Sequence, residues 1–358
     1  MLPHSGSRRR AARTLALAVV ACLLAAGCGS DAPEDDATSG STTVTDPTTP
    51  TTTAPPTTTV AEAEAETETE AEADARPTIV ALDETVAVAM LSLGIEPDHV
   101  LTTLSSETFA VLNKQLAIPT TDFVIAEPSF ELLAGLRPEL IVGIASPFVT
   151  QSIDEYERLA PTVVVPIDLS WQEQLRSLAA DLDAGTRAEQ VIRAIDELQG
   201  ATTDALADAG ATGRSVSLLT VRVGNVLAAD GTGSSGSLLT AVGLDRPATQ
   251  REPGPNGVPF LFLSNEAVAE QNADVLLLAE ATVFDLEPLL DSPVYAELPV
   301  VQAGAVHRVV GDAWMVGGTG FAAFWLLQDL EAIFVDDDPV GTLADTPARW
   351  RAFLELVG

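Results

Sequence analysis

Cysteine and histidine are scarce in this sequence of 358 residues. The two cysteines, Cys22 and Cys28, both lie near the N-terminus, so the rest of the chain can form no disulfide, no thiolate nucleophile and no cysteine metal site. Beyond the N-terminal segment, the histidines are His99 and His307, and they have no partner at metal-ligand spacing. No Ser-His-Asp set can be built around them. The sequence therefore predicts neither an enzyme nor a direct metal site.

Positive charge is also scarce, since 18 lysines and arginines face 52 acidic residues and give a net charge of −34. Lys114 is the one lysine of the chain. Proteins that bind nucleic acids need clustered cations to displace the counterions of the phosphates, so this class is excluded. The acidity is not confined to one end, because residues 77–358 alone retain a charge of −27.

The N-terminus combines four arginines, between Arg8 and Arg13, with an apolar run of 14 residues from Thr14 to Gly27. A bilayer span needs roughly 20 apolar residues, so the run favours a secretory signal over a membrane helix. The sequence LAAGC, which ends at Cys28, resembles the lipobox of bacterial lipoproteins. This resemblance implies a signal peptide over residues 1–27 and lipidation of Cys28. An ordinary signal peptide with an incidental cysteine is the alternative.

Residues 28–76 form a segment rich in Thr, Pro, Ala and Glu, with no aromatic residue. Such a composition cannot bury enough apolar surface to offset chain entropy, so it predicts a disordered tether of roughly 40 Å or more. A tether behind a lipidated cysteine indicates an extracytoplasmic protein anchored to the outer face of the cell membrane.

From residue 77 onward, short apolar runs alternate with longer amphipathic stretches, which is typical of an α/β fold. We expect an N-terminal lobe over 77–170, connecting helices over 171–209, with one long helix preceded by a shorter one, and a C-terminal lobe over 210–358. The expected strands are Thr78–Leu82, His99–Thr102, Asp122–Ala126, Leu140–Ile144, Thr162–Pro166, Ser215–Val223, Val226–Ala229, Val275–Ala279 and Val306–Val310.

A short pattern occurs twice, 135 residues apart. Ser129 precedes Glu131 by two residues, Ser264 precedes Glu266 in the same way, and a further acid follows each glutamate eight residues later at the start of an expected strand. The serines suit helix N-caps, and each glutamate then falls in the first turn, where the helix dipole favours a carboxylate. From spacing alone, a helix cap and a separate function are equally good interpretations.

These segments together resemble the iron-siderophore and cobalamin class of substrate-binding proteins, also called class III periplasmic binding proteins, which serve ABC importers. The resemblance covers most of residues 77–335 and is carried by the order and spacing of segments such as PSFELLAGLRPELIV, LSNEAVAEQNADVLLL and GGTGFAAFWLLQDLEAIF. It implies two α/β lobes joined by a single long backbone helix, with the ligand in a cleft between the lobes. It also implies a monomer that delivers its ligand to an ABC permease dimer with ATPase subunits.

The resemblance implies roles for particular residues. One exposed glutamate on each lobe docks onto arginines of the permease, and the motif match gives this role to Glu131 and Glu266. Arg222 stands where siderophore binders often place an arginine, and Trp314 matches a tryptophan that lines the cleft; a surface arginine and a packing indole are the alternatives. Weaker ligand candidates near expected strand ends, for each of which a core position is the preferred interpretation, are Phe109, Phe148, Trp171, Phe260 and Met315.

The expected function is the capture of an iron(III)-siderophore complex outside the membrane. A corrinoid such as cobalamin, or haem, is the nearest alternative ligand, and a non-transport surface lipoprotein on the same fold is an alternative of another class. The segment DFVIAEP, which ends at Pro128, lacks the aromatic or arginine found there in some relatives. The chemical type of the ligand therefore stays open at this point.

Overall fold

The computed structural model describes residues 76–103, 106–167, 169–222, 224–254, 259–282, 285–316 and 318–358. Residues 76–358 form one compact unit. The signal peptide, the lipidated Cys28 and the tether expected from the sequence lie outside the described residues, except for the last tether residue, Arg76, which forms an ion pair with Asp98 at 3.1 Å.

The first sheet has five parallel strands in the order β3-β2-β1-β4-β5. The central strand β1 is fully buried, as expected for a parallel strand that helices cover on both faces. Its strands are β1 (Ile79–Ala81), β2 (His99–Thr102), β3 (Thr120–Asp122), β4 (Leu140–Ile144) and β5 (Thr162–Val165).

The second sheet has the order β10-β9-β6-β7-β8, which is the same order when its strands are counted from β6 as the first. Strands β10, β9 and β6 are parallel, whereas β7 pairs antiparallel with both β6 and β8. A hairpin thus replaces the first helical crossover of the other lobe. Its strands are β6 (Val216–Arg222), β7 (Asn225–Ala229), β8 (Phe260–Leu263), β9 (Val275–Glu280) and β10 (Val306–Val310).

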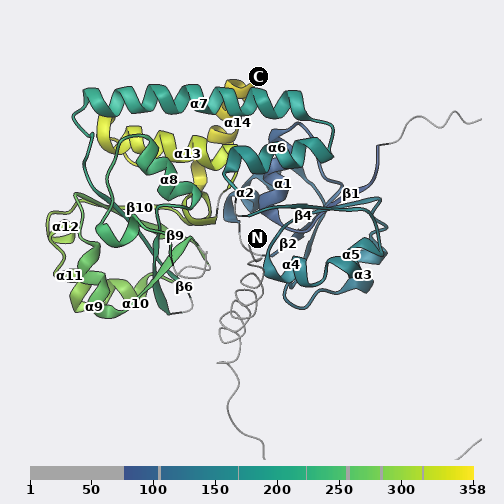
Figure 1. Cartoon of the computed structure of the whole chain (residues 1–358), viewed down its shortest axis with the longest axis horizontal. Helices are drawn as coiled ribbons and strands as arrows, with labels where there is room; N and C mark the ends of the chain where they lie inside the picture. The colour runs from purple at the N-terminus through teal and green to yellow at the C-terminus, as the bar shows by residue number, and fades with distance from the viewer. Residues whose placement is uncertain are drawn as a thin grey trace, which may run out of the picture. The chain divides into compact units, whose positions relative to one another are not determined.

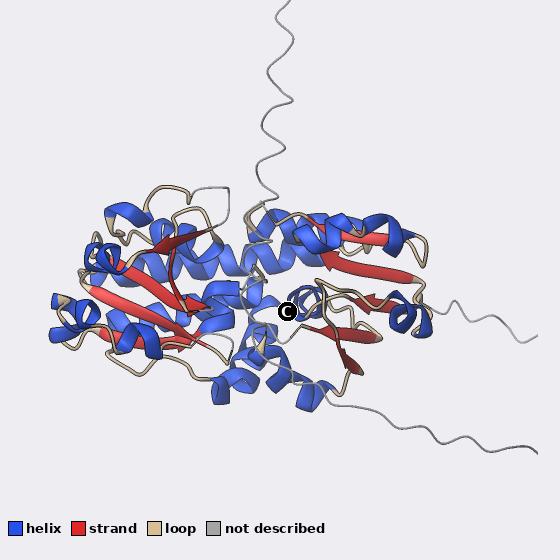
Figure 2. Ribbon diagram, turned by 90° about the horizontal axis from the view of Figure 1, so that it is seen from below, coloured by secondary structure: helices blue, strands red, loops and turns tan. Residues whose placement is uncertain are grey.

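Helices cover both sheets (Figures 1 and 2). In the first lobe these are α1 (Glu84–Ser92), α2 (Glu107–Leu116), α3 (Phe130–Gly135), α4 (Pro147–Gln151) and α5 (Ile153–Glu157). In the second they are α8 (Ser234–Ala241), α9 (Asn265–Val268), α10 (Glu287–Leu290), α11 (Pro293–Ala296), α12 (Pro299–Gln302) and α13 (Gly320–Glu331), with π-helical turns at Asp312–Val316 and Ala332–Asp336. The last helix, α14 (Thr346–Val357), packs against α2, α7 and α13.

Two helices connect the lobes, namely α6 (Trp171–Asp181) and the 24-residue α7 (Gly185–Asp208). Figure 1 shows α7 lying along one side of both lobes. Its buried residues Val191, Ile192 and Ile195 recur at helical spacing and face the core. At Gly320 of α13 an added Cβ would lie 3.0 Å from Val191 Cγ1, so glycine is what lets the two helices pack closely.

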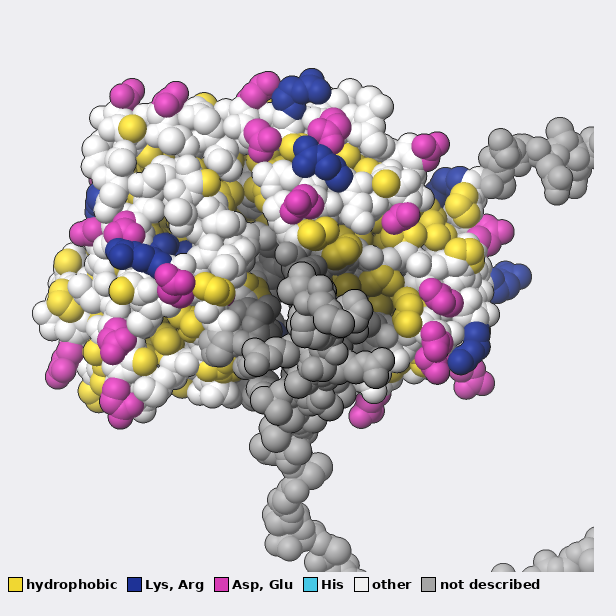
Figure 3. All heavy atoms as spheres, in the orientation of Figure 1, with side chains coloured by type: hydrophobic (Ala, Val, Ile, Leu, Met, Phe, Trp, Pro, Cys, Tyr) yellow, Lys and Arg dark blue, Asp and Glu magenta, His cyan; other side chains and the backbone are white. Residues whose placement is uncertain are grey.

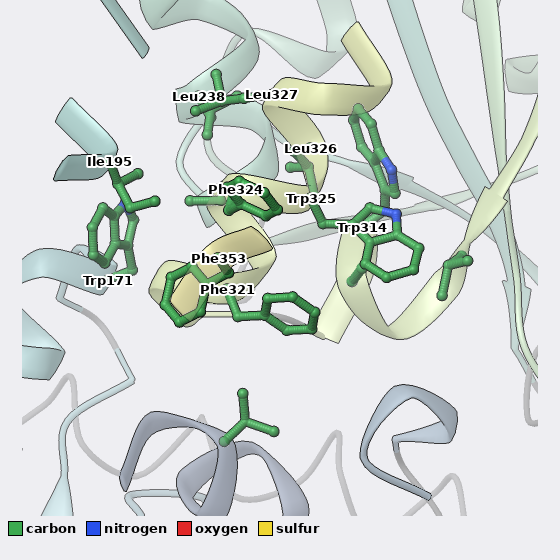
Figure 4. Packing of buried hydrophobic residues seen from close by; sticks show 14 of the residues in the cluster. Trp171, Ile195, Leu238, Trp314, Phe321, Phe324, Trp325, Leu326, Leu327 and Phe353 are labelled. Carbon is green, nitrogen blue, oxygen red and sulfur yellow. The ribbon is translucent and has the colours of Figure 1, made fainter. Parts of the chain in front are cut away.

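The largest hydrophobic cluster, here called the shared core, contains residues of both lobes. It includes Ala81 of β1, Leu218 of β6, and the aromatic residues of α13 and α14 that Figure 4 shows packed together. Two further clusters, here called the outer clusters, fill the opposite faces of the sheets. The outer cluster of the first lobe includes Leu101 and Ile141, and that of the second includes Leu219 and Leu278. Because one core spans both lobes, their mutual position is fixed by hydrophobic packing as well as by α7.

The structure corrects two strand expectations. Strand β3 covers Thr120–Asp122, so it ends where the expected strand begins. The apolar residue that follows, Phe123, is buried in the outer cluster of the first lobe and lies beyond the strand. Strand β8, Phe260–Leu263, was not expected at all.

Candidate functional site

The carboxyl ends of the parallel strands in the two sheets meet at the junction of the lobes. Asp312, just after β10, accepts hydrogen bonds at Oδ2 from Ser106 Oγ at 2.8 Å, from Thr108 N at 3.0 Å and from Thr108 Oγ1 at 2.5 Å. Thr282, just after β9, also donates to Glu107 of α2. These contacts join the end of one sheet to the helix that follows β2 in the other. In an α/β fold, ligands bind at this edge.

Two small hollows lie at this junction. One is lined by Thr85, Ser106, Thr108 and Asp312 together with residues at the start of α13. The other lies between α1, α6, the ends of β4 and β5, and Gly318 and Thr319 just before α13. Both draw their lining from the two lobes, so they lie where the lobes meet.

Arg222 is the last residue of β6 and is exposed. It pairs with Asn225 across the β6–β7 turn, where Gly224 has a φ of +72° that a side chain rarely adopts. Among the described residues no carboxylate forms an ion pair with Arg222. The structure thus presents a free guanidinium at the carboxyl end of a central strand.

The aromatic candidate Phe148 is half-buried at the start of α4, directly after β4, so it also lies at the carboxyl edge of its sheet. Phe260 does not, because it pairs with Ala229, whereas the cleft end of β7 is Asn225. Its ring packs against the shared core instead. Phe260 therefore lies at the end of its strand away from Arg222.

Trp314 is a packing residue in this structure, which corrects the expectation that its indole lines the cleft. The side chain has 0% exposure, and its Nε1 donates to Asp329 Oδ2 at 2.8 Å (Figure 4 shows the indole within the core). Asp329 also pairs with Arg349 at 2.7 Å; burial raises the pKa of Asp329, and this ion pair opposes the rise. A side chain with no exposed surface offers no face to a ligand.

For three of the weaker candidates the structure excludes the ligand role and agrees with the core alternative. Phe109, Trp171 and Met315 are all buried members of the shared core. Phe109 lies on the inner face of α2, and Trp171 packs beside Gly320 of α13. Their apolar side chains complete the contact between the lobes, so they stabilise the cleft without facing it.

The two repeated glutamates occupy equivalent places. Ser129 and Ser264 each cap a helix by accepting a first-turn backbone N–H at 3.3 Å, and Glu131 and Glu266 follow as exposed first-turn residues. The backbone N–H of Glu266 and the Ser264 hydroxyl lower the pKa of the Glu266 carboxyl. Figure 1 shows α3 and α9 on the side of their lobes away from α7.

The acid that follows each glutamate has the same structural task in both lobes. Glu139 Oε2 accepts from the backbone N–H of Thr78 at 2.7 Å, and Asp274 Oδ2 accepts from that of Ser215 at 2.7 Å. Each bond joins the start of one strand, β4 or β9, to the residue before the central strand of its sheet, β1 or β6. The repeat in the sequence is therefore a repeat in structure.

Several polar residues at the junction of the lobes were not identified as site candidates from the sequence. Besides Asp312, they include Asp83 and Glu84, which follow β1 after Leu82 and are buried. Asp83 Oδ1 caps α1 by accepting from Val86 N at 2.8 Å, and burial raises its pKa to about 6. Two consecutive acids after an apolar strand were the only available signal.

Within the described residues, no cluster of three or more His, Cys, Asp or Glu side chains is arranged to hold a metal ion. In the same residues no helix has the length and apolar character needed to cross a bilayer.

Known proteins similar to this chain agree with the architecture. A probable siderophore-binding lipoprotein of Bacillus subtilis, YfiY, is 25% identical over 271 residues, which cover 72% of this chain and 82% of the relative. SirA of Staphylococcus aureus, solved with staphyloferrin B, has the same fold with a TM-score of 0.61 at 19% identity, over 72% of this chain and 93% of SirA.

The siderophore periplasmic binding protein from the fuscachelin gene cluster of Thermobifida fusca aligns with a TM-score of 0.56 at 25% identity, over 72% of this chain and 97% of that protein. These relatives are binding proteins and not enzymes. The sequence profile of the periplasmic binding protein family matches residues 79–311, which run from β1 of the first lobe through β10 of the second. The chain therefore belongs to the periplasmic binding protein family.

Proposed function

We propose that this protein captures a ferric siderophore outside the cell membrane and delivers it to the permease of an ABC importer. The observation that carries the proposal is the family match over residues 79–311. The matched segment contains the strands of both sheets, and the cleft is expected where the carboxyl ends of those strands meet. The siderophore-binding relatives of similar sequence and fold support the ligand class.

The chemistry of the cleft supports an anionic ligand. Arg222 offers a guanidinium fork that no described carboxylate neutralises, in a protein with a large excess of acids. An arginine in this state binds carboxylate or phenolate oxygens in a bidentate manner. Phe148, at the carboxyl edge of the sheet in the first lobe, supplies apolar surface.

Glu131 and Glu266 are the proposed contacts with the permease. Each is an exposed carboxylate at the N-terminus of a short helix, and the two occupy equivalent positions in the two lobes. Two equivalent carboxylates suit a dimer with one arginine site in each half. Figure 3 shows acidic side chains spread over the outer parts of both lobes, which would assist attraction to a basic surface.

Attachment to the membrane is proposed to depend on Cys28 alone. The lipobox-like LAAGC sequence and the polar segment behind it support lipidation of this cysteine. We propose that the anchored protein acts as a monomer. Labelling of cells with a tagged fatty acid tests the lipidation: wild-type protein should carry the tag and Cys28→Ala should not. A tag retained by the variant would overturn the assignment.

A binding panel tests the proposed function. The four tryptophans, Trp171, Trp314, Trp325 and Trp350, are all buried, so a coloured ligand in the cleft should quench their emission by energy transfer without touching them. We expect saturable quenching by at least one ferric siderophore and none by the same chelator without iron. Tight binding of cobalamin or haem alone would replace the ligand, and no binding by any of them would favour a surface lipoprotein without a transport role.

A further inference from the structure

Phe262 is an exposed aromatic residue in an otherwise apolar strand. It lies in β8, whose sequence is FLFL, and 54% of its surface is exposed. Its neighbours Leu261 and Leu263 pack into the outer cluster of the second lobe. Because side chains alternate along a strand, Phe262 points to the opposite face, the one that also carries the shared core.

Arg222 lies on this same face of the sheet. In β6, Leu219 and Val221 belong to the outer cluster and Leu218 to the shared core, so Arg222 alternates onto the shared-core side. The register agrees. Arg222 pairs with Asn225 of β7, and Phe262 pairs with Leu227 of the same strand. Asn225 and Leu227 are two residues apart, so they lie on the same face of β7, and their partners lie on that face too. The ring and the guanidinium therefore project from one surface.

The spacing of the two side chains suits a single ligand. Two strand intervals separate β6 from β8, which is about 10 Å, and the register places the two residues about 7 Å apart along the strands. Both residues are exposed, so the helices that cover the shared core leave this end of the face open. A ferric chelate of siderophore size can span both groups.

The two groups select for particular chemistry. A guanidinium without an ion pair favours a ligand with net negative charge, and an exposed phenyl face favours a flat ring stacked or packed edge-on against it. Hydroxamate chelators have no aromatic ring, whereas catecholate and phenolate chelators present rings that carry the negative oxygens. Both features together indicate the second class.

We propose that Arg222 and Phe262 form one binding subsite for an anionic ferric complex whose iron is held by aromatic catecholate or phenolate rings. The inference rests on the proposed function and specifies its ligand. Phe262 thus takes the role that the sequence suggested for Phe260, whose ring packs against the shared core.

The test compares two probes, the iron(III) complex of a trimeric 2,3-dihydroxybenzoyl chelator and iron(III) ferrioxamine B, a hydroxamate complex. Wild-type protein should bind the catecholate complex at least tenfold more tightly. Phe262→Leu, which keeps apolar bulk and removes the ring, should weaken catecholate binding about tenfold, and Phe262→Tyr should restore it. Arg222→Gln should weaken it by tenfold or more. Since both side chains are exposed, the melting temperature of each variant should stay near that of wild type, which separates lost contacts from lost fold.

Two results would overturn the subsite while leaving the proposed function intact. One is tighter binding of ferrioxamine B than of the catecholate complex by wild-type protein. The other is unchanged catecholate affinity in Phe262→Leu. Failure of wild-type protein to bind any ferric complex would instead reject the proposed function, and the subsite with it.

Discussion

The two lobes share a strand order but differ in the connection after the central strand. In the first lobe α1 follows β1 and leads to a parallel neighbour, whereas in the second a tight turn follows β6 and leads to the antiparallel β7. The ends of the two central strands differ accordingly. Asp83 and Glu84 are buried at the start of α1, and Arg222 is exposed at the turn.

The common and the divergent parts of the lobes differ in their proposed roles. The segments common to both, β3-α3-β4 and β8-α9-β9, place Ser129-x-Glu131 and Ser264-x-Glu266 on equivalent surfaces. The segment that departs from the repeat, the β6–β7 hairpin, carries the arginine at the cleft. We infer that the repeated segments serve docking to a permease dimer, which has two equivalent halves. The β6–β7 hairpin, which occurs in one lobe, serves the ligand, which has no such symmetry.

The largest expected effect concerns the common segments. Replacing Glu131 and Glu266 with alanine should abolish uptake of the ferric ligand, because both arginine contacts with the permease are lost together. Each single change should reduce uptake less than the pair does. Growth on the ferric ligand as iron source, or uptake of radioactive iron, measures the effect.

A matched control uses Glu127 and Glu270, which are also exposed and lie near α3 and α9. Their double alanine variant should transport normally. Equal loss of transport in both double variants would mean that general acidity, and not the repeated positions, directs docking.

The junction between the lobes should show the next largest effect. Asp312→Ala removes the acceptor of three hydrogen bonds and leaves the buried backbone N–H of Thr108 without its acceptor, so the free energy of unfolding should fall by about 2–4 kcal/mol. Denaturant titration measures this. Asp291→Ala, an exposed acid of the same lobe, should change stability by less than about 0.5 kcal/mol. Similar values for both variants would show that the contact does not hold the lobes together.

The next prediction concerns Asp83, the buried acid that follows the central strand of the first lobe. Burial raises the folded pKa of Asp83 to about 6, above the ordinary value of 3.8, so between these values the folded state binds more protons than the unfolded state, and stability falls as pH rises. Ionisation of this buried carboxyl should lower the free energy of unfolding by about 3 kcal/mol in total once the pH is above 6. Asp83→Asn cannot ionise but keeps an oxygen to cap α1, so its stability relative to wild type should increase from pH 4 to pH 7. A difference that does not vary with pH would contradict the raised pKa.

The smallest expected effect compares the two strand-linking acids. Asp274 accepts from both the backbone N–H and the hydroxyl of Ser215, whereas Glu139 accepts from the backbone N–H of Thr78. Asp274→Ala should therefore cost about 1–2 kcal/mol and Glu139→Ala about 1 kcal/mol. Thermal unfolding of both variants measures the difference. A larger loss for Glu139→Ala would mean that the two lobes do not use the repeat equally.

Most of the fold could be predicted from the sequence, because the expected strands of both sheets other than β3 agree with the structure within about two residues at each end. Continuous apolar runs between turn residues identify buried parallel strands. Strand β8 was not predicted because its apolar run is short and follows a segment rich in proline and glycine.

The site was harder to predict because it depends on packing. Whether Trp314 faces a ligand or the core is decided by Asp329, fifteen residues later in the chain, whose carboxylate accepts the indole N–H. The face of Phe262 likewise depends on the register of three strands. Neither is encoded by the residues next to the side chain.

The central claim is that ligand binding and permease docking use separate parts of the two lobes. Affinity of one anionic ferric siderophore for Arg222→Ala and for the Glu131→Ala, Glu266→Ala double variant, measured beside wild type, tests it most directly. We predict that Arg222→Ala loses about 1.5–3 kcal/mol of binding free energy, and that the double variant binds as wild type does. Unchanged affinity in Arg222→Ala, or weakened affinity in the double variant, would contradict the claim.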